Sequence, residues 1–410
     1  MLIVQKFGGS SVADNERVLR VAKRITDTYR QGNKVVAVLS AQGDTTDDLY
    51  EKAYSVNPNA SKRELAMLLS TGEQQSVALM SMAIHGLGYP AVSLTGIQAG
   101  IYSSSAHENA RIRRIEPGRI QTELDKNNIV LIAGFQGVNR YGDITTLGRG
   151  ASDTTAAAIA AVLGADLCEI YTDVEGVYTA DPRVVKNARK IGELSFDEML
   201  ELASLGAKVL ATRSVEMAKK YHVKLVVRSS FTDAPGTEIK EECKVENTFI
   251  SGLAVDKDVA SISLIGLRDR PGIAFRIFSL LAKERISVDI ILQSIGRDNT
   301  KDISFTVAKS DLKQALAALE TAKNAIGFTD ITHNAGIAKL SVVGAGMASN
   351  PGVASKMFEA LSDAGINIMM ISTSEIKISV LIDAHDADRA ANAVHDRFFM
   401  ENEFEFAEKF

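Results

Sequence analysis

Residues that could bind an oxyanion stand near the start of the chain, in the segment Val4–Ser11, Val-Gln-Lys-Phe-Gly-Gly-Ser-Ser. Gly8 and Gly9 end a short apolar strand, and Ser11–Asp14 has the spacing of a capping box that opens a helix. Glycine lets backbone N–H groups approach an oxyanion closely, and a helix N-terminus favours negative charge. With Lys6 beside it, this turn predicts an anion site. The alternative is an ordinary strand-to-helix turn with a surface lysine. It is not a Walker A loop, because the lysine precedes the glycines.

Carboxylates and hydroxyls follow in two further stretches. The apolar run Val35–Leu39 leads into Ser40–Asp47, a loop dense in hydroxyl and carboxylate side chains. Thr71–Glu73 interrupts a helical pattern that runs from Arg63 to His85. Two interpretations of Glu73 remain open at this point: a carboxylate that binds a substrate, or a solvated charge on a helix surface.

An arginine between two glycines marks the stretch Thr145–Asp153, Thr-Thr-Leu-Gly-Arg-Gly-Ala-Ser-Asp. Gly148 and Gly150 allow sharp backbone angles, so Arg149 can be presented to a carboxylate or a phosphate. The last two residues of the stretch start an alanine-rich helix, Thr154–Leu163. We interpret Arg149 as a ligand-binding residue.

The stretch Thr172–Arg183 combines an acidic turn with an aromatic ring and a cation. Glu175-Gly176 could form only a hairpin turn. Tyr178 and Arg183 have the properties of an adenine-side wall and a phosphate contact. Further on, Lys208 follows a helix for which Ser195 and Glu198 form the predicted cap.

These residues require a scaffold, and apolar runs typical of strands buried on both faces precede most of them. Strand and helix patterns alternate to about residue 230, which predicts an α/β fold with a mostly parallel sheet sandwiched by helices. Ligands in such sheets bind beyond the carboxyl ends of the strands. Those strands are predicted at Leu2–Val4, Val35–Leu39, Ala91–Leu94, Ile129–Ala133, Cys168–Tyr171 and Leu225–Arg228.

Bulk composition narrows the class of protein. The 410 residues suffice for two or three domains, and the net charge of -5 argues against a nucleic-acid or anionic-membrane binder. No apolar run approaches the ~20 residues of a membrane span. Two cysteines and no signal-peptide pattern predict a cytoplasmic protein in a reducing compartment.

The second half of the chain contains an internal repeat. The pattern Ser263–Gly266, a Pro-Gly pair at 271–272 and an amphipathic helix recur as Ser341–Gly344, a Pro-Gly pair at 351–352 and a second helix. Each copy predicts a small ferredoxin-like β-α-β-β-α unit. The alternating tail Glu403–Ala407 predicts a closing edge strand.

The motifs of the first half, taken as a set, resemble the aspartate kinase branch of the amino acid kinase family. The residues that carry the resemblance are Lys6–Ser11, Ser40-Ala41, Asp44–Asp47, Thr71–Glu73, Gly134–Gly137, Leu147–Asp153, Tyr171–Pro182 and Gly206–Lys208. One departure is Ala151, where the family usually has a third glycine. If that position needs a positive φ, alanine would strain the loop.

The resemblance implies transfer of the γ-phosphoryl group of ATP, with Mg²⁺, to the side-chain carboxylate of L-aspartate. The product would be 4-phospho-L-aspartate, which leads to lysine, threonine and methionine. It implies catalytic roles for Lys6, Asp153 and Lys208. Aspartate would be bound by Thr45, Thr46, Glu73, Arg149, Gly150 and Ser152. ATP would be bound by Lys6, Phe7, Gly8, Gly9, Ser40, Thr172, Asp173, Tyr178, Arg183 and Lys208. A separate metal site is not implied, because the ATP phosphates would carry the Mg²⁺.

The repeats resemble paired ACT domains, which are small-molecule regulatory modules. This implies inhibition by lysine, threonine or both, and a homodimer formed through the ACT domains or a larger assembly with a regulatory subunit. The implied effector residues are Asp269, Ala274, Phe275, Ser287, Asp289, Gln293, Val353, Ala354, Asn367, Ile368, Ser374 and Glu375.

The predicted domain organisation is a catalytic domain at 1–240, a linker with a first strand at 241–260, and ACT domains at 261–330 and 331–410. A strand at about 249–255 would complete the second ACT domain, so that the first is inserted in it. Two other functions remain open. One is a sister kinase that acts on glutamate, acetylglutamate, carbamate or a nucleoside monophosphate, and the other is a non-catalytic amino-acid sensor.

Overall fold

The computed structural model describes residues 1–148, 150–206, 209–241, 250–294, 300–347, 350 and 352–400. The chain forms two compact units. The first comprises Met1–Tyr178, Lys190–Ser204 and the described residues of 208–245, and the second comprises Thr179–Arg189, Leu205-Gly206 and the described residues of 246–410. In the described part of the chain, no helix has the length and apolar character needed to cross a membrane.

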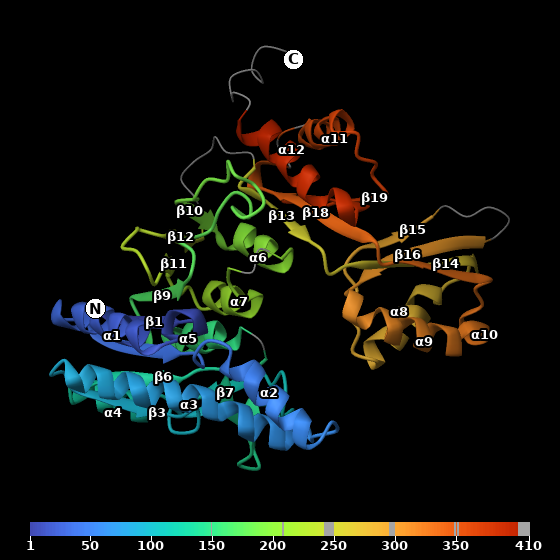
Figure 1. The fold of residues 1–410 in the computed structure, drawn as a ribbon. Helices are drawn as coiled ribbons and strands as arrows, with labels where there is room; N and C mark the ends of the chain where they lie inside the picture. The colour runs from blue at the N-terminus through green and yellow to red at the C-terminus, as the bar shows by residue number, and fades with distance from the viewer. Residues whose placement is uncertain are drawn as a thin grey trace. The chain divides into compact units, whose positions relative to one another are not determined.

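A large sheet forms the centre of the first unit (Figure 1). Every neighbouring pair of strands is parallel except β11 and β12. The predicted mostly parallel sheet is therefore confirmed. In spatial order its strands are β10 (Glu193–Ser195), β12 (Thr237–Lys240), β11 (Leu225–Ser229), β9 (Leu167–Thr172), β1 (Leu2–Phe7), β2 (Lys34–Leu39), β6 (Ile129–Ala133) and β3 (Ala91–Leu94).

Helices pack against this sheet. They are α1 (Asn15–Arg30), α2 (Thr45–Val56), α3 (Lys62–Gly86), α4 (Gly118–Asp125), α5 (Ala151–Leu163), α6 (Phe196–Ser204) and α7 (Thr212–Lys220). Phe7 packs with apolar residues of α1 and α3 in one buried core. Because successive strand residues point to opposite faces, Lys6 points away from that core.

A smaller sheet was not predicted. It contains β5 (Ile112–Ile115), β4 (Ile101–Ser103), β7 (Gln136–Val138) and β8 (Ile144–Thr146), in that order. Strands of three or four residues give too little alternation for a periodicity argument. Strand β8 leads directly into the glycine-rich stretch that begins at Leu147.

Helix starts differ from the sequence prediction in two places. Asp14 alone caps α1, accepting from the Arg17 amide (2.9 Å), while Ser11 lies in a short 3₁₀ turn, η1 (Gly9–Val12). Helix α5 begins at Ala151, three residues before the predicted Thr154, and Gly150 is its N-cap. The predicted cap of α6 is present, since the Ser195 hydroxyl donates to Glu198 Oε2 (2.7 Å).

The second unit contains two antiparallel sheets of four strands. The first repeat has strands β15 (Ile291–Gln293), β16 (Thr300–Val307), β14 (Ala260–Arg268) and β17 (Asp330–Asn334), in that order. Its helices α8 (Ile273–Lys283), α9 (Leu312–Thr321) and α10 (Lys323–Ile326) lie on one face of the sheet (Figure 1). The short 3₁₀ helix η2 (Lys309–Asp311) precedes α9.

The second repeat has strands β13 (Gly252–Asp256), β18 (Ile337–Val343), β20 (Lys377–Asp383) and β19 (Met370–Thr373), in that order. Its helices are α11 (Val353–Asp363) and α12 (Ala387–Phe399), with short 3₁₀ helices η3 (Ala345–Met347) and η4 (Ala384–Asp386). Strand β13 occupies the position that β17 has in the first repeat, although it precedes that repeat in the chain. The first repeat is thus inserted into the second.

Two short segments depart from the predicted boundary at residue 240. Thr179–Arg189 and Leu205-Gly206 belong to the second unit although they lie within the first half of the chain. The apolar side chains of Ala180 and Val185 explain the first case, because they are buried in the core of the second repeat. The tail strand predicted at 403–407 lies outside the described residues.

Candidate active site

The carboxyl end of β1 carries an ion pair. Lys6 Nζ lies 2.6 Å from Asp153 Oδ1, and the two side chains are only 11% and 8% exposed. Asp153 lies in the first turn of α5, and its second oxygen accepts from the Ala211 amide (3.3 Å). This is not a surface lysine. Burial beside a helix N-terminus makes the pair a fixed electrostatic feature of the site.

The glycine turn after Lys6 supports only part of the predicted anion site. The Gly8 amide donates to the Tyr171 carbonyl (3.3 Å), so it already has an acceptor. The Gly9 and Ser10 amides have no acceptor within the described residues. A Cβ at Gly9 would lie 2.8 Å from the Ala41 carbonyl oxygen. Of the two glycine amides predicted to bind an anion, that of Gly8 already has a backbone acceptor and that of Gly9 remains. The short distance to Ala41 explains why position 9 needs glycine.

Glu73 is a buried carboxyl group rather than a solvated helix charge. It is 3% exposed on α3, and its Oε1 accepts from the Ala41 amide (3.3 Å). Its Oε2 has no partner within the described residues. Burial raises the pKa of Glu73 to about 8. The neighbouring Gly72 allows α3 to approach this loop, since a Cβ there would lie 2.8 Å from Ala41 Cβ.

The N-terminus of α5 meets the end of β6. A Cβ at Gly134 would lie 2.6 Å from Ser152 Oγ, so glycine is needed for this approach. Gly150 caps the helix in the left-handed region (φ 70°), whereas Ala151 is the first helical residue. Alanine at that position therefore causes no strain of the kind considered from the sequence. Ser152 is buried.

The predicted hydroxyl residues of the neighbouring loop lie at the start of α2 and the end of β2. Thr45 and Thr46 are the first residues of α2 and are half-buried. The Ser40 amide donates to the Phe7 carbonyl (3.1 Å), which ties the end of β2 to that of β1. The main chain thus brings Ser40, Phe7 and Lys6 to one edge of the sheet.

The predicted nucleotide residues Thr172 and Asp173 follow β9, the other neighbour of β1. The Thr172 hydroxyl donates to Asp173 (3.0 Å), and the Thr172 carbonyl accepts from the Ser230 amide (2.9 Å). Tyr178 pairs with Lys190 in an antiparallel bridge. Arg183 belongs to the second unit, its side chain is 82% exposed, and it pairs with Asp181 (2.7 Å).

Two of the predicted binding residues, Arg149 and Lys208, lie outside the described residues. Arg213, on α7, was not predicted. Its guanidinium donates to the carbonyls of Leu147 (2.6 Å) and Ala110 (3.2 Å), and it thereby holds the start of the glycine-rich stretch. Burial lowers the pKa of Arg213. No local motif marks it, because its role depends on two carbonyls far away in sequence.

The predicted effector residues occupy equivalent places in the two repeats. Each set includes the first turn of a helix behind a left-handed glycine, Gly272 (φ 90°) or Gly352 (φ 106°). Each also includes residues around an edge strand, β15 or β19. In the first repeat the residues are Asp269, Ala274, Phe275, Ser287, Asp289 and Gln293. In the second they are Val353, Ala354, Asn367, Ile368, Ser374 and Glu375.

Two of these effector residues already have ionic partners. Asp269 pairs with Lys301 (2.7 Å), and Asp289 pairs with Lys339 (2.5 Å). Lys339 is itself buried on β18. Asp289 is therefore held by a lysine side chain of the second repeat.

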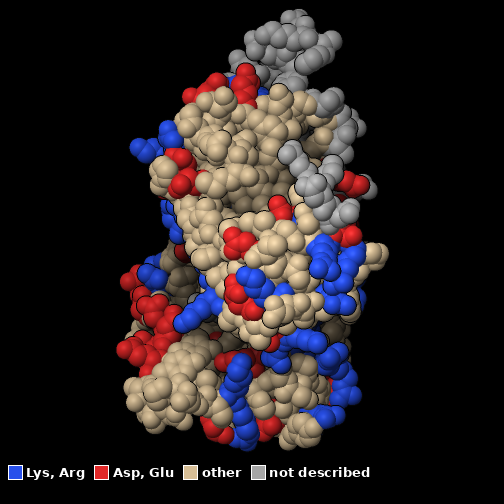
Figure 2. Space-filling view, turned by 90° about the vertical axis from the view of Figure 1, so that its right-hand side faces the viewer, with Lys and Arg blue, Asp and Glu red and all other residues tan. Residues whose placement is uncertain are grey.

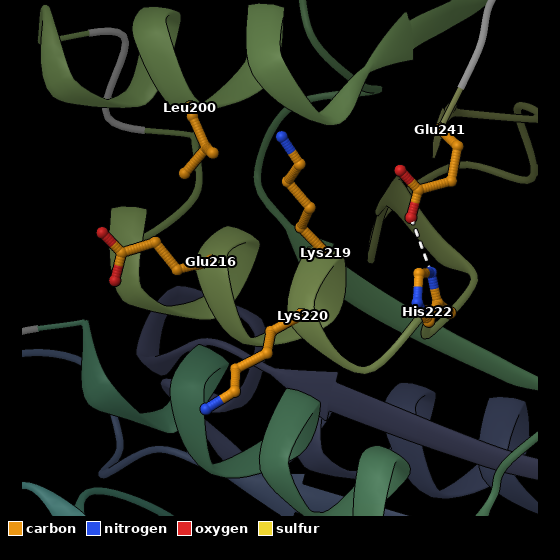
Figure 3. Close-up of a pocket in the computed structure, with 6 residues that line it drawn as sticks. All are labelled: Leu200, Glu216, Lys219, Lys220, His222 and Glu241. Carbon is orange, nitrogen blue, oxygen red and sulfur yellow. Dashed lines mark hydrogen bonds and ion pairs between the residues drawn. The ribbon is translucent and has the colours of Figure 1, made fainter.

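A hollow of about 360 Å³ lies elsewhere in the first unit (Figure 3). It contains none of the predicted site residues, and three of its lining residues are paired: His222 with Glu241 (2.8 Å), and Lys219 with Asp197 (2.5 Å). Its lining residues are Leu200, Glu216, Lys219, Lys220, His222 and Glu241. The face shown in Figure 2 carries both acidic and basic side chains, with broad uncharged areas between them.

The geometry of these charged groups suits phosphoryl transfer. Within the described residues there is no group of three His, Cys, Asp or Glu side chains that could hold a metal ion. Lys6 and the Gly9 amide offer positive potential at one place, and Glu73 offers a carboxyl oxygen in the same loop region. Such a site can hold two anionic reactants together.

Comparisons with known proteins agree with this geometry. The family model "Amino acid kinase family" matches residues 1–229, and the model "ACT domain" matches 262–322 and 340–398. An aspartokinase of Mycolicibacterium smegmatis is 50% identical over 403 residues, covering 97% of this chain and 96% of that protein.

Solved structures extend the similarity to the whole fold. E. coli aspartokinase III in complex with aspartate and ADP has a TM-score of 0.82 at 25% identity, covering 97% of this chain and 100% of that one. The same enzyme in complex with lysine and aspartate has a TM-score of 0.73 at 26% identity, covering 97% and 99%. The chain belongs to the amino acid kinase family, in its aspartokinase branch with paired ACT domains.

Proposed function

We propose that this protein transfers the γ-phosphoryl group of ATP to the side-chain carboxylate of L-aspartate. The observation that carries the proposal is the buried Lys6–Asp153 pair, together with the buried Glu73 carboxyl group that contacts Ala41. Ala41 also lies against Gly9, so the two charged groups border the same turn. The cation can bind a phosphate group, and the carboxyl group beside it can bind an ammonium group. This combination fits an amino-acid substrate that receives a phosphoryl group.

We assign a role to each residue of the site. Lys6 and the Gly9 amide neutralise charge on the transferring phosphoryl group, and Asp153 fixes the position of Lys6. Glu73 takes the α-ammonium of aspartate, Arg149 its α-carboxylate, and Ser152 with Thr45 and Thr46 completes the pocket. No general base is needed, because a carboxylate nucleophile is already ionised at neutral pH.

The nucleotide lies, in this proposal, beyond β1 and β9. The nucleotide is bordered by Phe7, Gly8, Ser40, Thr172, Asp173 and Tyr178. Its phosphates contact Lys208 and Arg183. Bound Mg²⁺ would supply positive charge that reduces the repulsion between the ATP phosphates and the attacking carboxylate. Asp153 is the described carboxylate of the site that could orient water molecules around it.

We further propose that lysine, threonine or both inhibit the enzyme through the ACT domains, as end products of the pathway that begins with 4-phospho-L-aspartate. The edge strands β15 and β19 support assembly through this unit. Ile291, Leu292 and Ile371 on these strands expose large apolar surfaces, and an unpaired strand edge can bind a second copy. A homodimer through the ACT domains is the simplest assembly; a separate regulatory subunit is the alternative.

An ATP-dependent hydroxamate assay tests the activity on acceptors that form an acyl phosphate, and ADP release tests a nucleoside monophosphate, whose product does not react with hydroxylamine. We expect product with L-aspartate and none with glutamate, acetylglutamate, carbamate or a nucleoside monophosphate. Product with one of those acceptors would identify a sister kinase, and no product with any acceptor would identify an amino-acid sensor. Adding lysine, threonine, both, or methionine shows which end product inhibits, and sedimentation measures the assembly.

A further inference from the structure

The chain leaves the first unit after Tyr178 and returns to it at Lys190. The two ends are held together, because Tyr178 bridges Lys190 and the Ile191 amide donates to the Val177 carbonyl (2.8 Å). The intervening segment Thr179–Arg189, here named the excursion, belongs to the second unit. Tyr178, which we assign to the ATP site, is therefore followed directly in the chain by Thr179, a residue of the second unit.

The excursion inserts two apolar side chains into a hydrophobic core, although more than half of its residues are exposed. Ala180 and Val185 are 3% and 1% exposed among the core residues of the second repeat. The Asn392 side chain on α12 donates to the Val184 carbonyl (3.1 Å), and Asn187 donates to Asp396 (3.3 Å). The position of the excursion is consequently determined by the second repeat.

Thr179 is the most strongly anchored residue of the excursion. Its carbonyl accepts from the Leu253 amide of β13 (2.7 Å), and its hydroxyl accepts from the Arg189 amide (3.0 Å). The same hydroxyl lies 2.9 Å from His395 Nε2 on α12 and forms a hydrogen bond with it whose donor depends on the ring tautomer. The His395 ring is fully buried and stacks on Phe399. This contact joins the residue after Tyr178 to a helix of the second repeat.

A second segment packs on the same strand. Gly206 has a φ of +101°, and a Cβ there would lie 3.4 Å from the Val255 carbonyl oxygen and 3.8 Å from Asp256. Gly206 stands two residues before Lys208, another residue that we assign to ATP. Strand β13 therefore contacts Thr179 and Gly206. The first follows Tyr178 and the second stands two residues before Lys208, and we assign both Tyr178 and Lys208 to ATP.

Strand β13 is also linked to an effector residue. Lys339 on β18 lies 3.6 Å from Asp256 and 2.5 Å from Asp289, and its side chain is 5% exposed. A buried cation is costly to leave unpaired, so a movement of Asp289 would act on Asp256. The effector region, β13 and the excursion thus form one connected set of contacts within the second unit.

We propose that Thr179 and His395 are positioning residues for the ATP subsite. Through β13 and the excursion, the second ACT domain determines the position of Tyr178 and thereby the affinity for ATP, while the aspartate pocket is left largely unchanged. Neither residue contacts a substrate. The assignment of Tyr178 to ATP rests on the proposed function; the contacts of the excursion do not.

The test compares full-length Thr179→Val and His395→Leu with wild type. Both variants remove the hydrogen bond between the two side chains without adding charge, and Thr179→Val also removes the hydroxyl that accepts from the Arg189 amide. We expect the Kd for ATP, titrated without aspartate, and the KM for ATP to rise about 5-fold in His395→Leu, the effect of one lost hydrogen bond, and at least as much in Thr179→Val. The KM for aspartate should stay within twofold. His395→Gln should bind ATP as tightly as wild type does, because its side-chain amide can form the hydrogen bond with the Thr179 hydroxyl that His395→Leu lacks.

Ser379→Ala is the matched control, since it removes a buried hydroxyl that pairs with Ser341 (2.7 Å) in the same repeat, away from the excursion. It should change neither constant. Hydrogen exchange of residues 173–178 should accelerate only in the first two variants. An unchanged Kd for ATP in both variants, or an equal rise in both KM values, would overturn the proposal. If Thr179→Val does not fold, the His395 pair decides. A wild-type protein that binds ATP without phosphorylating aspartate would overturn the proposed function instead, and the Kd comparison would still stand.

Discussion

Lys6 occupies a largely buried position, at which a charged lysine side chain has a desolvation cost. It lies on β1, between β2 and β9, and its ammonium group is largely removed from water. Asp153 compensates part of the desolvation cost and leaves the cation directed toward the end of the sheet. A lysine placed in this way is positioned in advance for a developing anionic charge, which is where electrostatic catalysis has its largest effect.

Replacing Lys6 should therefore act on the chemical step. We expect Lys6→Ala to reduce kcat on the order of 10²-fold or more, because one cation is lost from the transferring phosphoryl group. Lys34→Ala is the control, since Lys34 lies at the start of the adjacent strand and pairs with Asp125 in solvent. Steady-state kinetics of both variants checks this; a kcat for Lys6→Ala within a few-fold of wild type would contradict it.

Glu73 predicts a pH dependence. Its pKa is about 8 because of burial, against an ordinary value of 4.5, so below pH 8 the free enzyme holds this carboxyl group mostly protonated. An aspartate ammonium group favours the ionised form, so substrate binding should release a proton. The KM for aspartate should fall as the pH rises from 6 to 8, by no more than about tenfold per pH unit.

Two measurements check this prediction. Calorimetric titration of aspartate in buffers of different ionisation enthalpy gives the number of protons released, and Glu73→Gln should abolish both the release and the pH dependence. The linkage also has a stability side. Because the folded-state pKa is raised, the contribution of Glu73 to stability is lost as the pH rises from about 4.5 to about 8 and stays constant above that, so Glu73→Gln should gain Tm relative to wild type across this range. No proton release at pH 6.5 would exclude this role.

At the scale of elements, the site depends on how closely α5 and α3 approach the strand ends. Gly134 at the end of β6 and Gly72 on α3 are each in contact with a neighbouring loop or helix that a Cβ would displace. Both approaches bring functional groups, Ser152 and Glu73, toward the edge of the sheet. The glycines thus set the distance between the elements.

Gly134→Ala should push the N-terminus of α5 away from the sheet, because the new Cβ would lie 2.6 Å from Ser152 Oγ. A displacement of about 1 Å in a catalytic constellation can cost on the order of 10²-fold, so we expect kcat/KM to fall by that amount. Gly86→Ala, at the end of α3, is the control, since nothing lies within 4 Å of the added Cβ. Unchanged kinetics in Gly134→Ala would show that the helix can adjust.

At the scale of the whole molecule, the proposed regulation requires that ligands of one unit act on the chemistry of the other. A ligand can shift such an equilibrium only by its differential affinity for the two states. Couplings of roughly 1–3 kcal/mol, about 5- to 150-fold in apparent affinity, are typical. Effector-site variants should therefore change inhibition and leave the uninhibited rate unchanged.

Gln293→Ala is the better variant for this test, because Gln293 is not part of the Lys339 ion pairs. Asp289→Ala should also relieve inhibition, but it would leave the buried Lys339 with only Asp256, at 3.6 Å, and should lower stability as well. We expect the inhibition curve of Gln293→Ala for lysine or threonine to shift to higher concentration at unchanged kcat. Gln314→Ala, on α9, is the control. Wild-type inhibition in both effector variants would place the effector site elsewhere.

Local pattern was enough for much of this molecule. Six of the eight strands of the large sheet contain short apolar runs, as expected for strands buried on both faces, and four of these carry Lys6, Ser40, Gly134 and Thr172 at or just beyond their carboxyl ends. The repeat in the second half likewise marked two units of the same topology. Residue type and spacing identified the chemistry, since an anion site needs glycines and a cation wherever it is built.

Tertiary structure alone decided the rest. Glu73 could be a surface charge or a buried carboxyl until its burial was known, and Arg213 acts through carbonyls supplied by distant loops. The place of β13 in the second repeat and the excursion Thr179–Arg189 also depend on contacts between segments far apart in the chain. Periodicity reports only which side of an element is apolar. Which distant partner covers that side is settled by the packing of the whole chain.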